Sequence, residues 1–157
     1  MRYFLAFAAL LVGVACINDV AGPRQLVLQY QITALGCDTP CIRPNRTPVT
    51  SAARGDTVWI EHVIQLAGTL DTTFAATVRP DCAENVAIEF GDSTVATAPV
   101  PATCPDSTFQ QEYATFVPVT RQTLWPVDAA LSPGFHVIVG RILVAPLAEP
   151  KLGFTVQ

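Results

Sequence analysis

One stretch of the sequence, residues 57–66, restricts the fold more than any other. Its apolar residues and one histidine occupy every second position: Val58, Ile60, His62, Ile64 and Leu66. A period of two residues places these side chains on one face of a β-strand, whereas an amphipathic helix needs apolar residues three and four positions apart. The stretch therefore predicts a strand with one buried face.

Similar short segments recur along the chain at spacings of about ten residues, separated by turns that contain proline or glycine. We predict strands at residues 26–33, 72–79, 85–90, 93–98, 107–117, 124–131, 135–144 and 152–157, with residues 48–50 as the one candidate for an additional brief strand. Gly91 and Asp92 predict a hairpin turn, and the remainder of residues 34–56 predicts a loop. No segment after residue 24 keeps a helical period. The fold class predicted for residues 25–157 is therefore all-β, an antiparallel sandwich of about seven to nine strands.

The first fifteen residues have the features of an export signal. Arg2 provides a positive charge, residues 3–12 are apolar and uncharged, and Val14 and Ala15 are small residues of the kind that precede a cleavage site. The apolar run ends at Cys16, too early for a membrane-spanning helix, which needs about 20 apolar residues. We therefore predict an N-terminal signal helix that is removed on export.

The end of this signal, Val12-Gly13-Val14-Ala15-Cys16, resembles the lipobox of bacterial lipoproteins, in which the cysteine becomes the lipid-bearing N-terminus. The resemblance implies a lipoprotein signal peptide at residues 1–15, lipidation of Cys16 and a spacer over residues 16–24. Gly13 replaces the usual leucine, and Gly13 with Ala15 also fits ordinary signal cleavage. Because Ile17 follows the cysteine, the resemblance to enterobacterial lipoproteins favours the outer membrane.

The cysteine count connects the signal with the fold. Five cysteines are an awkward number for an exported protein, where free thiols oxidise or cross-link. Lipidation of Cys16 leaves four, which allow three pairings. We favour Cys37–Cys41, closing a short turn, and Cys82–Cys104, closing a longer loop. A zinc site from the same four cysteines is disfavoured, because the second two are far apart and structural zinc sites use two close pairs.

A second resemblance concerns the sandwich itself. Residues 131–137 resemble the start of the penultimate strand in bacterial immunoglobulin-like domains, which reads leucine, proline-glycine, then an aromatic residue: Leu131-Ser132-Pro133-Gly134-Phe135-His136-Val137. Residues 54–58 match the start of the second strand in such domains. The resemblance implies an immunoglobulin-like topology. Phe135 stands where the family usually has tyrosine, so the hydroxyl bond of a tyrosine corner is absent.

Several functions can be excluded from residue types. The net charge of −4 becomes −5 when Arg2 leaves with the signal, and no basic cluster is present, so we predict no nucleic-acid partner. A blue-copper site usually needs a methionine ligand, and the single methionine is Met1. Ser93 follows Gly91 and Asp92 as in Gly-Asp-Ser esterases, but no matching Asp precedes His136, so we interpret these residues as a turn.

These observations predict a non-enzymatic module with no catalytic residues, no cofactor and no metal. The candidate binding residues are two tryptophans and two histidines: Trp59, His62, Trp125 and His136. The expected partners are the membrane, through lipid at Cys16, and another envelope protein or surface ligand. The alternative is a periplasmic β-sandwich protein that binds a small molecule or metal through His62 or His136.

Overall fold

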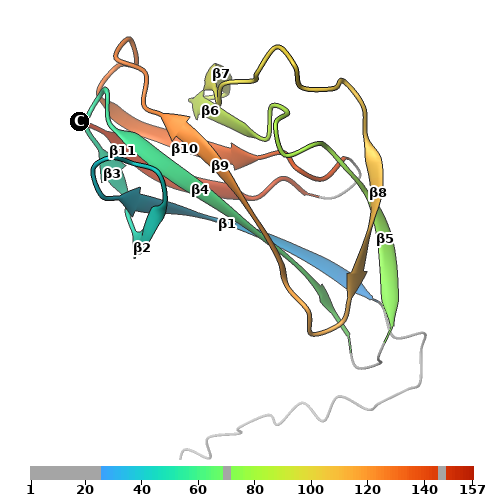
Figure 1. Cartoon of the computed structure of the whole chain (residues 1–157). Helices are drawn as coiled ribbons and strands as arrows, with labels where there is room; N and C mark the ends of the chain where they lie inside the picture. The colour runs from blue at the N-terminus through green and yellow to red at the C-terminus, as the bar shows by residue number, and fades with distance from the viewer. Residues whose placement is uncertain (1–25, 69–71, 145–147) are drawn as a thin grey trace, which may run out of the picture.

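The computed structural model describes residues 26–68, 72–144 and 148–157 (Figure 1). Within these residues the chain forms eleven strands and no helix. The predicted signal peptide, Cys16 and the spacer to residue 24 lie outside the described residues. Because the described residues form strands and no helix, the predicted all-β class is confirmed for them.

The first sheet contains four strands in the order β2-β1-β4-β9. Their bounds are β2 Pro44–Pro48, β1 Val27–Cys37, β4 Thr57–Ala67 and β9 Val119–Pro126. β4 is the strand predicted from the two-residue period, and every second side chain along it, from Val58 to Leu66, is buried. It pairs antiparallel with β1 on one side and with β9 on the other. The alternation therefore marks the central strand of this sheet.

The second sheet contains five strands in the order β3-β11-β10-β6-β7. Their bounds are β3 Ser51–Ala52, β11 Lys151–Val156, β10 Gly134–Gly140, β6 Val86–Phe90 and β7 Ser93–Thr97. Strands β1, β4 and β9 opposite β7, β6, β10 and β11 reproduce the arrangement of strands A, B, E and C′, C, F, G in an immunoglobulin-like sandwich. One pairing is parallel, between β3 and β11. The predicted immunoglobulin-like class is confirmed.

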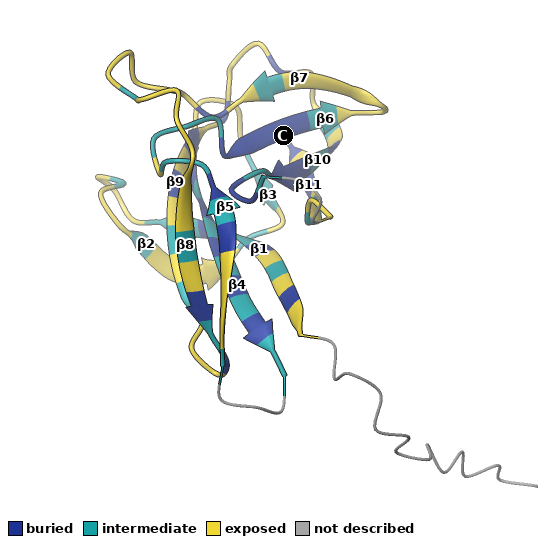
Figure 2. Ribbon diagram, turned by 90° about the vertical axis from the view of Figure 1, so that its right-hand side faces the viewer, coloured by how far each residue is buried: buried dark blue, intermediate teal, exposed yellow. Residues whose placement is uncertain are grey.

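A third, two-stranded sheet stands beside the sandwich and is made of β5 (Thr73–Val78) and β8 (Phe109–Ala114). Figures 1 and 2 show this pair along one side of the molecule, running from the β6 region to the turn between β8 and β9. Isolated bridges from Leu66 to Thr115 and from Val78 to Leu143 connect it to the larger sheets. The pair adds a side wall that the immunoglobulin-like prediction did not include.

Buried side chains form two clusters. The main core fills the space between the two larger sheets, with Trp125 packed edge-on against Phe154 at a centroid distance of 5.5 Å. The side core lies under the β5–β8 pair and includes Tyr113. Tyr30 packs against both clusters. A Cβ atom at Gly140 would lie 2.6 Å from the Tyr30 hydroxyl, so only glycine lets β10 cross this point.

The boundaries of several elements differ from the prediction. The strand predicted at 124–131 is β9 and ends at Pro126, and it begins five residues earlier, at Val119. Residues 34–56 are not simply a loop, because β1 continues to Cys37 and β2 and β3 follow. The hairpin at Gly91 is confirmed, and Gly91 has the positive φ of 62° that its turn requires.

Candidate functional site

A cleft of about 730 Å³ lies between the β5–β6 connection and the segment that leads into β8. Both lie at one edge of the side wall. The lining residues are Arg79, Pro80, Ala83, Glu84, Val100, Cys104, Pro105, Asp106, Ser107, Thr108 and Val144. The cleft thus combines charged groups of both signs and hydroxyl groups with a few apolar side chains.

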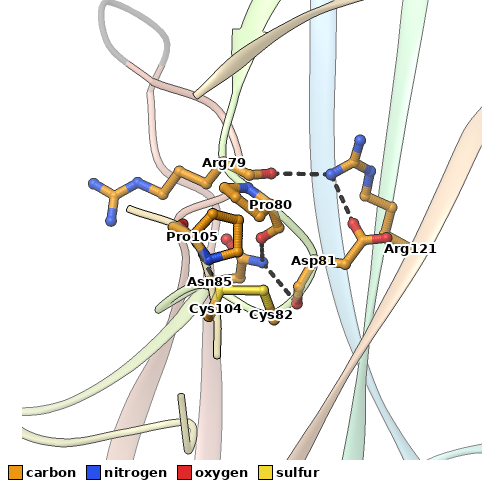
Figure 3. The surroundings of a disulfide bond; sticks show 8 residues. All are labelled: Arg79, Pro80, Asp81, Cys82, Asn85, Cys104, Pro105 and Arg121. Atoms are coloured by element: carbon orange, nitrogen blue, oxygen red, sulfur yellow. Dashed lines mark hydrogen bonds and ion pairs between the residues drawn. A yellow bond between two sulfur atoms is a disulfide. The ribbon is translucent and has the colours of Figure 1, made fainter. Parts of the chain in front are cut away.

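The Cys82–Cys104 disulfide joins the two segments that form the cleft, with its Cα atoms 5.5 Å apart (Figure 3). Asn85 is fully buried beneath it. The Asn85 side-chain amide donates to the carbonyl oxygens of Pro80 at 2.8 Å and Asp81 at 3.2 Å. The disulfide and these bonds hold the loop around Cys82, so one wall of the cleft is fixed without a regular strand.

Arg121, on β9, connects the cleft to the sandwich (Figure 3). Its guanidinium forms an ion pair with Asp81 at 2.7 Å and donates to the Arg79 carbonyl oxygen at 3.1 Å. It also donates to the side-chain oxygen of Gln111 and lies over the ring of Phe109, 5.4 Å from its centroid. A single cation therefore contacts the end of β5, the cleft loop and β8.

The charged groups of the cleft differ in how they are partnered. Glu84 accepts a hydrogen bond from Arg141 at 3.2 Å. Figure 3 shows the Arg79 side chain extending away from Arg121, and Arg79 forms no ion pair with any described residue. The hydroxyl of Ser107 lines the same hollow. The Arg79 guanidinium and the hydroxyl groups of the lining can bind carboxylate or hydroxyl oxygens of a ligand, and the Asp106 carboxylate adds a negative charge to the same lining.

His62, one of the predicted binding residues, is completely buried and belongs to a hydrogen-bonded chain. The Ile142 N–H donates to the Tyr30 hydroxyl oxygen at 3.3 Å, and the Tyr30 O–H in turn faces His62 Nδ1 at 2.8 Å. This arrangement assigns the imidazole proton to Nε2, which donates to the Thr123 hydroxyl at 3.0 Å. Both nitrogens of His62 are therefore engaged inside the protein.

Burial sets the protonation of His62 and Tyr30 in this hydrogen-bonded chain. Burial, together with the positive charge of Arg121, lowers the pKa of His62 from 6.5 to about 4. Burial also raises the pKa of the Tyr30 hydroxyl well above its usual value. His62 and Tyr30 therefore both stay neutral around pH 7. Because His62 is neutral and already bonded on both sides, the hydrogen bonds from Tyr30 through His62 to Thr123 serve as a structural connection between β1, β4 and β9.

The other three predicted binding residues are also placed by the structure. His136 is buried, bonds to the Gly134 carbonyl oxygen through Nδ1 at 3.0 Å, and packs against Phe90. Trp125 belongs to the main core and is 1% exposed. Trp59 is half-buried on the outer face of β4. The side chains of the candidate binding residues His62, Trp125 and His136 are thus buried away from any ligand at the surface, and of the four only Trp59 reaches solvent.

The four cysteines in the described residues pair as predicted, Cys37 with Cys41 and Cys82 with Cys104. They are therefore not available as zinc ligands. Across residues 26–68, 72–144 and 148–157, no group of three or more His, Cys, Asp or Glu side chains is arranged to hold a metal ion. Ser93 begins β7, opposite Phe90 in the hairpin. Two disulfides fit an exported protein, because such bonds persist in oxidising compartments.

Sequence reasoning did not identify Arg79, Arg121 or Asn85. Their roles depend on contacts between distant segments, such as the 42 positions between Arg121 and Arg79. The one available signal was Cys82, since a disulfide at that position marks a loop held in a fixed shape. Across the described residues, no helix has the length and hydrophobicity that a membrane-spanning segment requires.

Comparison with known proteins gives only remote similarity. No protein-family model matches the chain, and no curated protein matches it in sequence. A solved β-glucosidase from Erythrobacter marinus superposes with a TM-score of 0.46 and 13% identity, over 84% of this chain and 16% of the glucosidase. A β-glucosidase from Listeria innocua, in complex with glucose, gives a TM-score of 0.43 and 9% identity over 83% of this chain. This chain also corresponds to 16% of the Listeria enzyme, and similarity at this level supports no functional conclusion.

Proposed function

We propose that this chain is a lipoprotein of the bacterial cell envelope, anchored by lipid at Cys16, whose sandwich acts as a non-enzymatic binding module. One observation carries the proposal. The two disulfides use four of the five cysteines. Cys16 is thereby left without a disulfide partner within the chain, in the position where the lipobox resemblance requires the modified residue. Ile17 favours the outer membrane as the location.

The cleft beside Cys82–Cys104 is the proposed binding surface. Its loop is fixed by the disulfide, by Asn85 and by Arg121 before any ligand arrives. A fixed wall reduces the ordering cost of binding. The Arg79 guanidinium supplies a positive group toward a partner that carries carboxylate or hydroxyl oxygens. We propose a neighbouring envelope protein or a surface ligand of that chemistry as the occupant.

Intact mass spectrometry of the chain extracted from bacterial membranes tests the anchor. We expect a chain that begins at Cys16 and carries a diacyl or triacyl adduct. The Cys16→Ser variant, made in the same host, should lose the adduct and leave the membrane fraction. An unmodified wild-type chain in the soluble fraction would contradict the anchor.

The cleft also favours a second candidate, a soluble periplasmic protein that binds a small molecule. A hollow of about 730 Å³ is of the size that holds a drug-sized ligand. Native mass spectrometry of the chain purified without denaturation distinguishes the candidates. A small-molecule adduct lost in Arg79→Met, but kept in the control Arg43→Met outside the cleft, would favour this second function. A bare chain carrying only its lipid would favour the first.

A further inference from the structure

Five exposed apolar side chains gather at one end of the molecule, which we name the apolar end. They are Leu26, Val27, Phe74, Phe116 and Val117, each between 41% and 69% exposed. Figures 1 and 2 show that the start of β1, the end of β4, the start of β5 and the turn from β8 to β9 all meet there. The residues come from three segments that are distant in sequence, so their meeting is a property of the fold.

Contacts at Gly68 connect these segments. A Cβ atom built on Gly68 would lie 2.9 Å from the Leu26 side chain and 3.4 Å from the Thr115 side chain. Thr115 directly precedes Phe116, and it also bridges to Leu66 at the end of β4. The point at which the described chain begins therefore lies beside the turn that carries the two most exposed side chains of the apolar end.

Phe116 has an unusual backbone. Its φ of 64° lies in the left-handed region, which a bulky side chain rarely adopts, and the side chain is nevertheless 69% exposed. Strain of this kind persists where the surrounding structure compensates for it, and it is concentrated at functional sites. Burial within the chain does not provide that compensation here, because most of the Phe116 ring faces solvent. The turn thus holds an aromatic ring outward at an energetic cost.

The apolar end carries few charges. The described segments that meet there, residues 26–33, 64–68, 72–76 and 112–120, contain one charged side chain, Glu112, and Asp71 stands in the sequence between two of these segments. The whole chain, in contrast, contains nine Lys and Arg and thirteen Asp and Glu side chains. A surface with few charges lowers the cost of removing ions from water when it enters a lipid headgroup region. Aromatic and aliphatic side chains are the types that anchor proteins at such an interface.

We propose that the apolar end rests on the lipid bilayer, with Phe116 and Val117 inserted among the headgroups. The inference depends on the proposed lipid at Cys16. Cys16 precedes Leu26 by ten positions, a length of chain that spans at most about 35 Å when fully extended. The tether therefore holds the apolar end, where it joins the sandwich, within about 35 Å of the bilayer. The cleft beside Cys82–Cys104 then lies at the other end of the β5–β8 pair, away from the bilayer.

Fluorescence of tryptophan placed at the turn tests the contact in the lipidated full chain. Phe116→Trp and, separately, Val117→Trp are reconstituted into vesicles of dibrominated phosphatidylcholine or of the unbrominated lipid. We expect loss of fluorescence and a blue shift in the brominated vesicles for both variants. Trp59 and Trp125 of the wild-type chain supply the baseline. Phe135→Trp is the matched control, because Phe135 is 64% exposed but lies at the start of β10, at the other end.

The outcomes separate the possible failures. Intact mass is measured first, and a chain without lipid at Cys16 would overturn the anchor itself. If lipid is present but Phe116→Trp and Val117→Trp are quenched no more than Phe135→Trp, the membrane contact is overturned. A blue shift that appears in detergent as the protein concentration rises, without any quenching by brominated lipid, would assign the apolar end to a second copy of the chain.

Discussion

The two cores of this sandwich differ in how they are closed. The main core lies between two sheets of four and five strands and is filled by apolar side chains such as Trp125 and Phe154. The side core is covered by only two strands, β5 and β8, which pair with each other and join the larger sheets through isolated bridges. Its attachment to the first sheet uses the Arg121 guanidinium, which contacts Arg79, Asp81 and Gln111. The Tyr30–His62–Thr123 hydrogen bonds tie β1, β4 and β9 together at the boundary between the two cores. The β5–β8 sheet has no continuous strand pairing with the larger sheets and is thus held to them by specific polar contacts.

Matched isoleucine substitutions should give the largest effect and test this difference directly. Ile138 in the main core and Ile142 in the side core are both almost completely buried. We expect Ile138→Ala to lower the free energy of unfolding by about 4 kcal/mol and Ile142→Ala by about 2 to 3 kcal/mol, because two strands relax into a cavity more easily than two full sheets. Urea denaturation of both variants measures the losses. Equal losses, or a larger one for Ile142→Ala, would show that the side core is packed as firmly as the main core.

Acid should weaken the boundary between the cores. The pKa of His62 is lowered from 6.5 to about 4, so between these values the unfolded chain takes up a proton that the folded chain excludes. Stability is fully present above about pH 6.5 and falls as the pH is lowered toward about 4, by about 3 kcal/mol in total.

The difference in unfolding free energy between the wild-type chain and His62→Gln, followed over this pH range, isolates the contribution of His62. Glutamine stays neutral, so the variant is expected to be less stable at pH 7 but to lose less stability on acidification. Parallel curves for the two proteins would mean that His62 does not titrate between folded and unfolded states.

Loss of the Arg121 guanidinium should lower the free energy of unfolding least among these variants. Its effect should be concentrated in β5 and β8. Arg121→Met keeps much of the apolar stem but removes the contacts to Asp81, Gln111 and the Arg79 carbonyl. Because Asp81 is largely exposed, we expect a loss of about 1 to 2 kcal/mol.

Hydrogen exchange should then accelerate in β5 and β8 while β10 keeps its protection. Arg141→Met is the control, since Arg141 pairs with Glu84 and Glu149 rather than with the β5–β8 pair. Uniform acceleration over all strands in Arg121→Met would contradict a local role for this residue.

The sequence predicted the elements that depend on local signals and missed those that depend on contacts with other strands. The period in β4 and the Gly91 hairpin are local signals, and both were read correctly. The disulfide pairs also followed from sequence, because only a few pairings were available. The start of β9 was missed because Arg121 and Thr123 face inward where the alternation would place apolar residues. Their polar partners lie on other strands, so the pattern of β9 alone could not show it.

The candidate site was predicted less well than the fold. His62, Trp125 and His136 were interpreted as binding residues, yet each is buried in the sandwich. Burial of a histidine depends on partners such as Tyr30, 32 positions away, that supply its hydrogen bonds. The cleft likewise depends on the meeting of residues 79–84 with residues 100–108. Residue types indicated what chemistry was absent, while the location of the cleft required the three-dimensional structure.

The parallel pairing of β3 with β11 has a consequence for how such a chain reaches its folded state. Ser51 pairs beside Thr155, so the two partners are separated by about 100 residues of sequence, and contacts of this range slow the search for the native topology. Because a chain is synthesised from its N-terminus, β3 is made long before β11 is available to pair with it. Until β11 is made, the second sheet lacks the strand that joins β10 to β3.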